Sequence, residues 1–188
     1  MDSLQAIILG ITQGLTEFLP VSSSGHLVIL QQLLGLEAPE LFFNISVHLG
    51  TLLAVVIVFR TDIRELGRSL RRLLAVIFLK DADFKTLFED AEFKMLWLIF
   101  VGFFPTAVLG VVFHEIGEQV FSSVFVVGIM LMITGALLWL TRRVKQEGGG
   151  LESFSIRTAL LIGLVQGLAI MPGISRSGST IALGLFLG

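Results

Sequence analysis

Residues 8–26 read ILGITQGLTEFLPVSSSGH, and residues 161–180 read LIGLVQGLAIMPGISRSGST. Each stretch contains a run of Pro, Ser and Gly that interrupts an apolar region, Leu4–Leu36 or Thr158–Gly188. Each region therefore predicts a half-helix, a polar break and a second half-helix. Non-helical backbone at membrane depth is tolerated only where protein or a water-filled cavity surrounds it. We therefore predict two re-entrant helical hairpins that line a cavity.

The composition is that of a membrane protein. Of the 188 residues 54% are apolar and 15% are charged, and the mean hydropathy is +0.91; soluble domains carry about 25% charged residues. The net charge of −2 provides no basic surplus for binding nucleic acid. The chain has no Cys, which excludes disulfides and thiolate chemistry. We expect residues 1–188 to form a single transmembrane domain.

Three more segments are apolar and long enough to cross a bilayer: Phe42–Phe59, Met95–Phe113 and Val120–Leu140. The positive-inside rule places the basic stretches 60–94 and 142–157 in the cytoplasm. The loops Glu37–Glu40 and His114–Gln119 contain no Lys or Arg and are expected outside. The stretch 60–94 predicts either a basic amphipathic helix on the inner surface or a solvated connector.

The two interrupted regions resemble each other. Gly10, Gln13, Gly14 and Leu15 recur 153 residues later, and so does Gly25 as Gly178. Pro20 and Ser23 match Pro172 and Ser175 at an offset of 152. Chance similarity between two Gly- and Leu-rich segments is the alternative. Because the two hairpins are expected to enter from opposite faces, the pattern indicates an inverted-topology repeat.

The predicted fold is an all-α polytopic membrane protein with spanning helices and two re-entrant helical hairpins related by that inverted repeat. The first repeat covers about 1–113, and the second, which we expect to be incomplete, covers about 120–188.

Glu17 and Arg176 are the two charged residues that lie inside apolar segments. Burying a charge at membrane depth costs several kcal/mol, so such a residue is a functional candidate by default. A structural ion pair between helices is the alternative. Since sites in repeat folds lie where broken helices meet, the two breaks should bring Glu17 and Arg176 together.

The second break predicts an anion site. A helix N-terminus offers free N–H groups, Ser and Thr add hydroxyl donors, and Arg offers a fork that matches phosphate oxygens. We therefore expect the substrate-binding residues to include Ser175, Ser177, Gly178 and Thr180 beside Arg176. A capped half-helix without a ligand is the alternative.

The first break contains Ser22, Ser23, Ser24 and His26, and we expect Ser22 and Ser24 to bind substrate. Ser23 and His26 are one helical turn apart, so a nucleophile and its base could share a face, with Glu17 as base, orienter or cation ligand. The alternative is that His26 is a packed hydrogen-bonding residue.

Gln13 and Glu17 lie four residues apart and could place two oxygens on a cation such as Mg²⁺ or Ca²⁺. His48 is expected only to make an interhelical hydrogen bond.

These residues resemble the undecaprenyl-diphosphatase family of integral membrane phosphatases, which is linked to bacitracin resistance. The resemblance rests on residues 13–26, QGLTEFLPVSSSGH, on residues 172–180, PGISRSGST, and to a lesser degree on residues 104–110, FPTAVLG. It implies removal of the terminal phosphate of undecaprenyl diphosphate at the outer face of the membrane, which regenerates the carrier for peptidoglycan synthesis. It covers the chain up to Gly188, where we expect a C-terminal truncation relative to the family.

The resemblance also implies roles for single residues. Ser23 matches the proposed nucleophile, His26 its catalytic partner, and Arg176 the diphosphate-binding Arg. Glu17 matches the second acid of an acidic pair whose first member is Gln13 here, which weakens the implied divalent-cation site.

The implied partners are a polyprenyl diphosphate lipid and the bilayer, with a homodimer left open and nucleic acid excluded. The implied location is the plasma (inner) membrane, with an outward-facing site. A polyprenyl-phosphate flippase or another secondary transporter is the alternative function, because transporters also use broken helices and inverted repeats.

Overall fold

The computed structural model describes residues 1–36, 41–79, 91–120, 123–144 and 154–188. These residues are helical, apart from short caps and breaks. The helices are α1 (Ser3–Phe18), α2 (Ser23–Leu33), α3 (Leu41–Val58), α4 (Arg60–Leu79), α6 (Ala91–Val120), α7 (Val124–Thr141), α8 (Ile156–Leu168) and α9 (Arg176–Leu187). The prediction of an all-α polytopic membrane protein is confirmed.

Helices α1 and α2 form the first hairpin. Asp2 and Gln5 form a capping box at the start of α1, with Gln5 N donating to Asp2 Oδ1 at 2.7 Å. Gln5 Nε2 also donates to Leu34 O at 3.1 Å, which holds the beginning of α1 beside the end of α2. The chain therefore turns back on itself at residues 19–22, which we call the first break.

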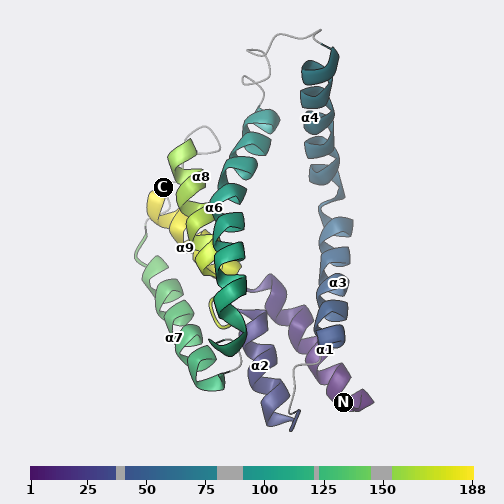
Figure 1. Ribbon diagram of the computed structural model, residues 1–188, viewed down its shortest axis with the longest axis vertical. Coiled ribbons are helices and arrows are strands. Elements are labelled where there is room, and N and C mark those ends of the chain that lie inside the picture. The colour runs from purple at the N-terminus through teal and green to yellow at the C-terminus, as the bar shows by residue number, and fades with distance from the viewer. Residues whose placement is uncertain (37–40, 80–90, 121–122, 145–153) are drawn as a thin grey trace.

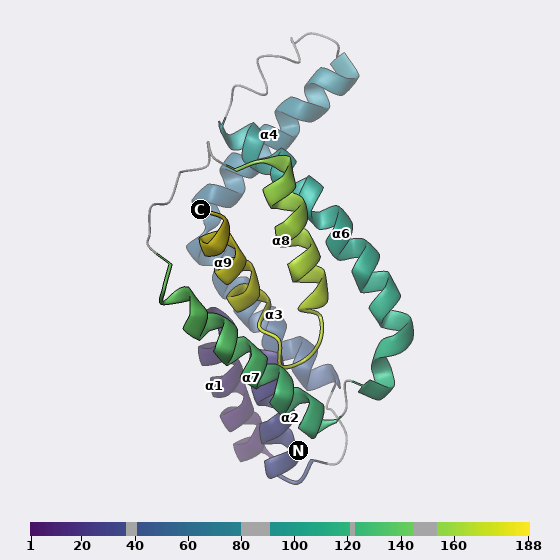
Figure 2. The same ribbon diagram turned by 90° about the vertical axis from the view of Figure 1, so that its left-hand side faces the viewer.

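Helices α8 and α9 form the second hairpin, and residues 169–175 between them are the second break. Figure 1 shows α1 and α2 at the lower end of the molecule and α8 and α9 reaching down from the upper end. Figure 2 shows the second break pointing down toward α2 and α7. The two hairpins thus reach the middle of the molecule from opposite ends, and their relation by an inverted repeat stays a prediction.

The two breaks pack backbone against backbone. A Cβ added to Gly25 would lie 2.8 Å from Gly173 Cα, and one added to Gly178 would lie 2.7 Å from Pro20 O. Gly173 has φ of +97°, in the left-handed region that favours glycine. Each hairpin therefore needs a glycine in its second half-helix to let the other hairpin approach.

Two helices have the length and composition to cross a membrane, over Phe93–Phe113 and Val124–Thr141. A third span is available if Phe42–Val58 and Arg60–Ala75, which meet at an angle of 80°, are counted together. Only 11% of the residues in each clear span are buried, so most of their side chains face outward, as expected for lipid-facing helices.

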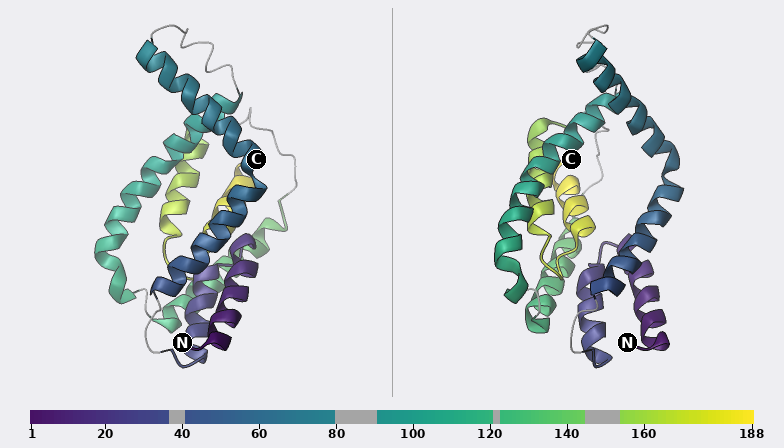
Figure 3. Two further views of the ribbon diagram at one scale, coloured as in Figure 1. Left: turned by 90° about the vertical axis from the view of Figure 1, so that its right-hand side faces the viewer. Right: turned by 45° about the vertical axis from the view of Figure 1, so that its right-hand side comes forward.

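Some predicted boundaries are wrong. Residues 114–119, predicted as a loop, are the last turns of α6, and the third span begins at Val124 rather than Val120 because Ser123 is its N-cap. Residues 60–79 form an amphipathic helix, which Figure 3 shows bending away from α3. The predicted loop Glu37–Glu40 and parts of both basic stretches lie outside the described residues.

Candidate active site

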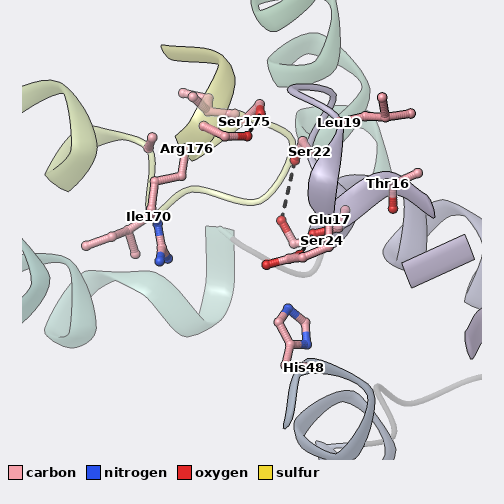
Figure 4. Close-up of a pocket in the computed structure, with 13 residues that line it drawn as sticks. Thr16, Glu17, Leu19, Ser22, Ser24, His48, Ile170, Ser175 and Arg176 are labelled. Carbon is pink, nitrogen blue, oxygen red and sulfur yellow. Dashed lines mark hydrogen bonds between the residues drawn. The ribbon is translucent and has the colours of Figure 1, made fainter. Parts of the chain in front are cut away.

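A cavity of about 280 Å³ lies where the two breaks meet. This volume is near the lower end of the range of about 300–1,000 Å³ for ligand pockets, which suits a small polar group. Figure 4 shows side chains from both hairpins and from α3 around the cavity. The lining residues are Thr16, Glu17, Leu19, Ser22, Ser23, Ser24, His48, Ala169, Ile170, Ile174, Ser175, Arg176 and Ser177.

The first break ends in a serine cap. Ser22 Oγ accepts a hydrogen bond from Gly25 N at 3.4 Å, and it lies 3.4 Å from Ser24 Oγ. Ser22 itself is buried and has φ of 67°, an uncommon conformation for a residue with a side chain. The first break is thus a strained turn that leads directly into α2.

The second break ends in the same way. Ser175 Oγ accepts from Gly178 N at 3.0 Å and lies 3.3 Å from Ser177 Oγ. The two cap residues, Ser22 and Ser175, are 153 residues apart. The match of Ser175 with Ser23 predicted from the sequence is therefore displaced by one residue. The hairpins therefore share one side-chain cap, although the backbone of Ser22 is left-handed and that of Ser175 is extended, and the residues directly after the caps occupy equivalent positions.

Ser23 follows the first cap and contacts Glu17. Its Oγ donates to Glu17 Oε2 at 2.5 Å, and Gln13 Nε2 donates to the same oxygen at 2.9 Å. The predicted alternative of an ion pair between Glu17 and Arg176 is not present among the described residues. The Glu17 carboxylate instead accepts a hydrogen bond from Ser23, whose hydroxyl could act as a nucleophile.

The side chains present do not fit a cation held between Gln13 and Glu17. Gln13 is fully buried and turns its amide donor, not its oxygen, toward the carboxylate, and its Oε1 has no hydrogen-bond partner. The described residues also contain no cluster of three or more His, Cys, Asp or Glu that could hold a metal ion. A hard cation prefers several oxygen ligands, and this pair offers it only the Glu17 carboxylate, whose Oε2 already accepts two hydrogen bonds.

Arg176 follows the second cap at the first position of α9. Its side chain reaches into the cavity opposite Ser22 and Ser24 in Figure 4. Within the part of the chain that the structure describes, no ion pair neutralises it. A guanidinium at a helix N-terminus, facing a cavity with two serine hydroxyls, has the chemistry that an anion site requires.

Other predicted site residues do not line the cavity. His26 directs Nδ1 to Ser22 O at 2.8 Å, and the described residues show no hydrogen bond between His26 and Ser23. Thr180 donates to Arg176 O at 3.0 Å, within its own helix. Gly178 acts through its N–H, as the partner of the cap.

Two residues of the site were missed by sequence reasoning. His48, expected only to bridge helices, lines the cavity from α3. Thr134 of α7, which is buried, holds the second break: its Oγ1 donates to Gly173 O at 2.9 Å and accepts from Ser175 N at 3.0 Å. Both residues lie in apolar segments without a local motif. The only sequence feature that could have indicated them is a polar side chain within a predicted span.

The family described as "Bacitracin resistance protein BacA" matches residues 6–188. A curated protein named undecaprenyl-diphosphatase from Desulfosudis oleivorans is 52% identical over 189 residues, which cover 100% of this chain and 68% of the relative. Its namesake from Desulfatibacillum aliphaticivorans is 49% identical with the same coverage. One from Halothermothrix orenii is 40% identical and is covered over 65% of its length. The chain thus spans about two thirds of the length of these relatives.

Proposed function

The chain belongs to the family of bacitracin resistance protein BacA, and from this membership we propose that it is an integral membrane phosphatase. Its substrate is undecaprenyl diphosphate, and its products are undecaprenyl phosphate and inorganic phosphate. The observation that carries the proposal is the single cavity that joins the Ser23–Glu17 pair of one hairpin to Arg176 of the other.

The second hairpin is suited to hold the diphosphate. Arg176 offers a planar fork of donors, and the N–H groups at the start of α9 add a positive helix end. Ser177 and Ser175 line the same wall. Because the cavity is smaller than a typical ligand pocket, it accommodates the headgroup while the prenyl chain stays in the bilayer.

The first hairpin is suited to attack the terminal phosphorus. Ser23 Oγ forms the new P–O bond as its proton passes to Glu17 Oε2, which already accepts its hydrogen bond. The bond from the terminal phosphorus to the bridging oxygen breaks, and undecaprenyl phosphate leaves with its charge stabilised by Arg176. Water then hydrolyses the phosphoserine. In the rival scheme Glu17 or His26 activates water directly, and Ser23 only donates a hydrogen bond.

His26 remains part of the proposed machinery through its motif position. Its Nδ1 faces a backbone carbonyl, which only accepts, so Nδ1 carries the proton and Nε2 is the nitrogen left for proton transfer. Through Ser22 O the ring also holds the strained turn before Ser23. The cation implied by the family stays a prediction, and no step above depends on it.

We place the enzyme in the plasma membrane with the cavity open to the outside, where it recycles the lipid carrier for cell-wall synthesis. The positive-inside pattern supports this orientation. Cys introduced at position 68 or 143 should resist an impermeant thiol label in intact cells, and Cys introduced between residues 37 and 40 should react. A homodimer and the lack of nucleic-acid binding remain predictions.

Phosphate release tests the function directly. The chain purified in detergent should release inorganic phosphate from undecaprenyl diphosphate, and the Arg176→Ala variant should not. A flippase in proteoliposomes would instead move the lipid between leaflets without releasing phosphate, and that result would contradict the proposal.

A further inference from the structure

The cavity has a third wall that neither hairpin supplies. His48, on α3, is the only residue of α3 that lines it among those described. Figure 4 shows the imidazole pointing from α3 toward Ser24 and Glu17, with Arg176 on the other side of the cavity. A titratable ring thus faces the space between the nucleophile and the anion-binding Arg.

The orientation of this ring is fixed. His48 Nδ1 lies 2.7 Å from Asn44 O, one turn earlier on α3. Because a carbonyl oxygen only accepts, Nδ1 must carry a hydrogen, and Nε2 is the nitrogen left for a ligand. His26 makes the same bond to Ser22 O, but His26 does not line the cavity.

The helix that carries His48 is held against the first hairpin. Asn44 Oδ1 accepts a hydrogen bond from Gln31 Nε2 at 2.9 Å, and Gln31 is 5% exposed on α2. This partly buried amide contact links α3 to the helix that begins at Ser23. The distance between His48 and the nucleophile is therefore set by the fold rather than by a mobile loop.

Charge balance indicates what the ring binds. Glu17 and Arg176 are the charged groups that line the cavity, and their formal charges cancel. A terminal phosphate brings a charge of about −1.5 to −2 at pH 7. A further donor beside Arg176 would help to balance that charge, and the His48 ring faces the space where the phosphate would lie.

We propose that His48 is a substrate-contacting residue whose Nε2–H donates to an oxygen of the terminal phosphate, opposite Arg176. The identity of the substrate in this inference rests on the proposed function. The contact with His48 itself would form with any diphosphate in the cavity. The ring and the guanidinium would hold the phosphate from two sides while Ser23 approaches from the third.

The test compares His48→Ala and His48→Gln with Ser46→Ala. Ser46 is a matched control because it lies on the same helix, is exposed, and donates only to Phe42 O of its own helix. Calorimetric binding of inorganic diphosphate and kcat/KM for phosphate release are both measured, and thermal unfolding in detergent checks that each variant is folded. Gln keeps a polar end of similar size, so it carries the test if the Ala variant does not fold.

Loss of a charge-assisted hydrogen bond should weaken diphosphate binding and kcat/KM by roughly ten- to a hundredfold in the His48 variants. Ser46→Ala should stay within about twofold of the parent. Folded His48 variants that bind diphosphate as the parent does would overturn the inference. If the parent releases no phosphate, the proposed function fails, and diphosphate binding still decides the role of His48.

Discussion

The two hairpins share a cap and differ in the residue that follows it. Ser22 and Ser175 both accept a hydrogen bond from a glycine N–H three residues later. The next residue is Ser23 in the first hairpin and Arg176 in the second. The same side-chain cap thus precedes a hydroxyl on one side of the cavity and a cation on the other.

The difference extends along the preceding half-helices. In α1, Gln13 donates to Glu17, and in α8 the equivalent Gln166 donates to Thr106 Oγ1 at 3.3 Å. The position equivalent to Glu17 is Ile170, which is apolar. The comparison teaches that two hairpins with the same side-chain cap can carry different chemistry, because the residues around the cap differ.

Removal of the nucleophile should have the largest effect. Ser23→Ala should reduce phosphate release by more than about a thousandfold if Ser23 forms the covalent intermediate. Acid quenching of the parent during turnover should trap phosphate on Ser23. A loss of only ten- to about a hundredfold without trapped phosphate would show that Ser23 just donates a hydrogen bond and would favour attack by water.

Activity should depend on the shape of the side chain at position 176, the equivalent position in the second hairpin, as well as on its charge. Arg176→Lys keeps the charge and loses the fork, so kcat/KM should fall by roughly ten- to a hundredfold. Arg143→Lys is the control, because Arg143 stacks on Trp139 at 5.2 Å and does not line the cavity. Equal activity in both Lys variants would remove the anion-binding role of Arg176.

The crossing of the two breaks can be disturbed by adding a single methyl group. Gly178→Ala should destabilise the fold by about 1–3 kcal/mol, because its Cβ would lie 2.7 Å from Pro20 O. Gly184→Ala, on the same helix with nothing within 4 Å of the added Cβ, should leave stability unchanged or raise it slightly. Thermal unfolding measures both, and equal unfolding temperatures would contradict the close crossing.

The smallest effect should come from Gln13. Gln13→Glu replaces the donor to Glu17 with a second carboxylate in a fully buried position. Activity without added metal should fall modestly, and stimulation by Mg²⁺ or Ca²⁺ should increase, since two carboxylates suit a hard cation. The readout is phosphate release against cation concentration. If the dependence of phosphate release on cation concentration is unchanged, residues 13 and 17 do not determine the need for a cation.

Much of this architecture could be predicted from the sequence, because Pro20 and Pro172 interrupt an apolar helix and the serines after them favour the start of a new one. The meeting of Glu17 and Arg176 at one cavity followed from the repeat. The pairing of Ser23 with Glu17 did not, because helix spacing ranked His26 as the nearer partner and could not show how the strained Ser22 turn aims the hydroxyl.

His48 was missed for a different reason. A lone His in an apolar segment has no spacing to interpret, and its position depends on how α3 packs against the first hairpin. The contact between Asn44 and Gln31 that sets this packing joins residues 13 positions apart on two helices. Contacts of this kind depend on tertiary structure, and no periodic pattern in the sequence indicates them.

The contact of Gly178 with Pro20 O has a consequence for how the protein is made. The ribosome synthesises the first hairpin roughly 150 residues before the glycine that packs against it. At about 5–20 residues per second, this delay lasts on the order of 8–30 s. Throughout it, the Ser-rich turn at residues 20–24 lacks its later neighbour. Water or the insertion machinery must solvate that turn until the second hairpin arrives.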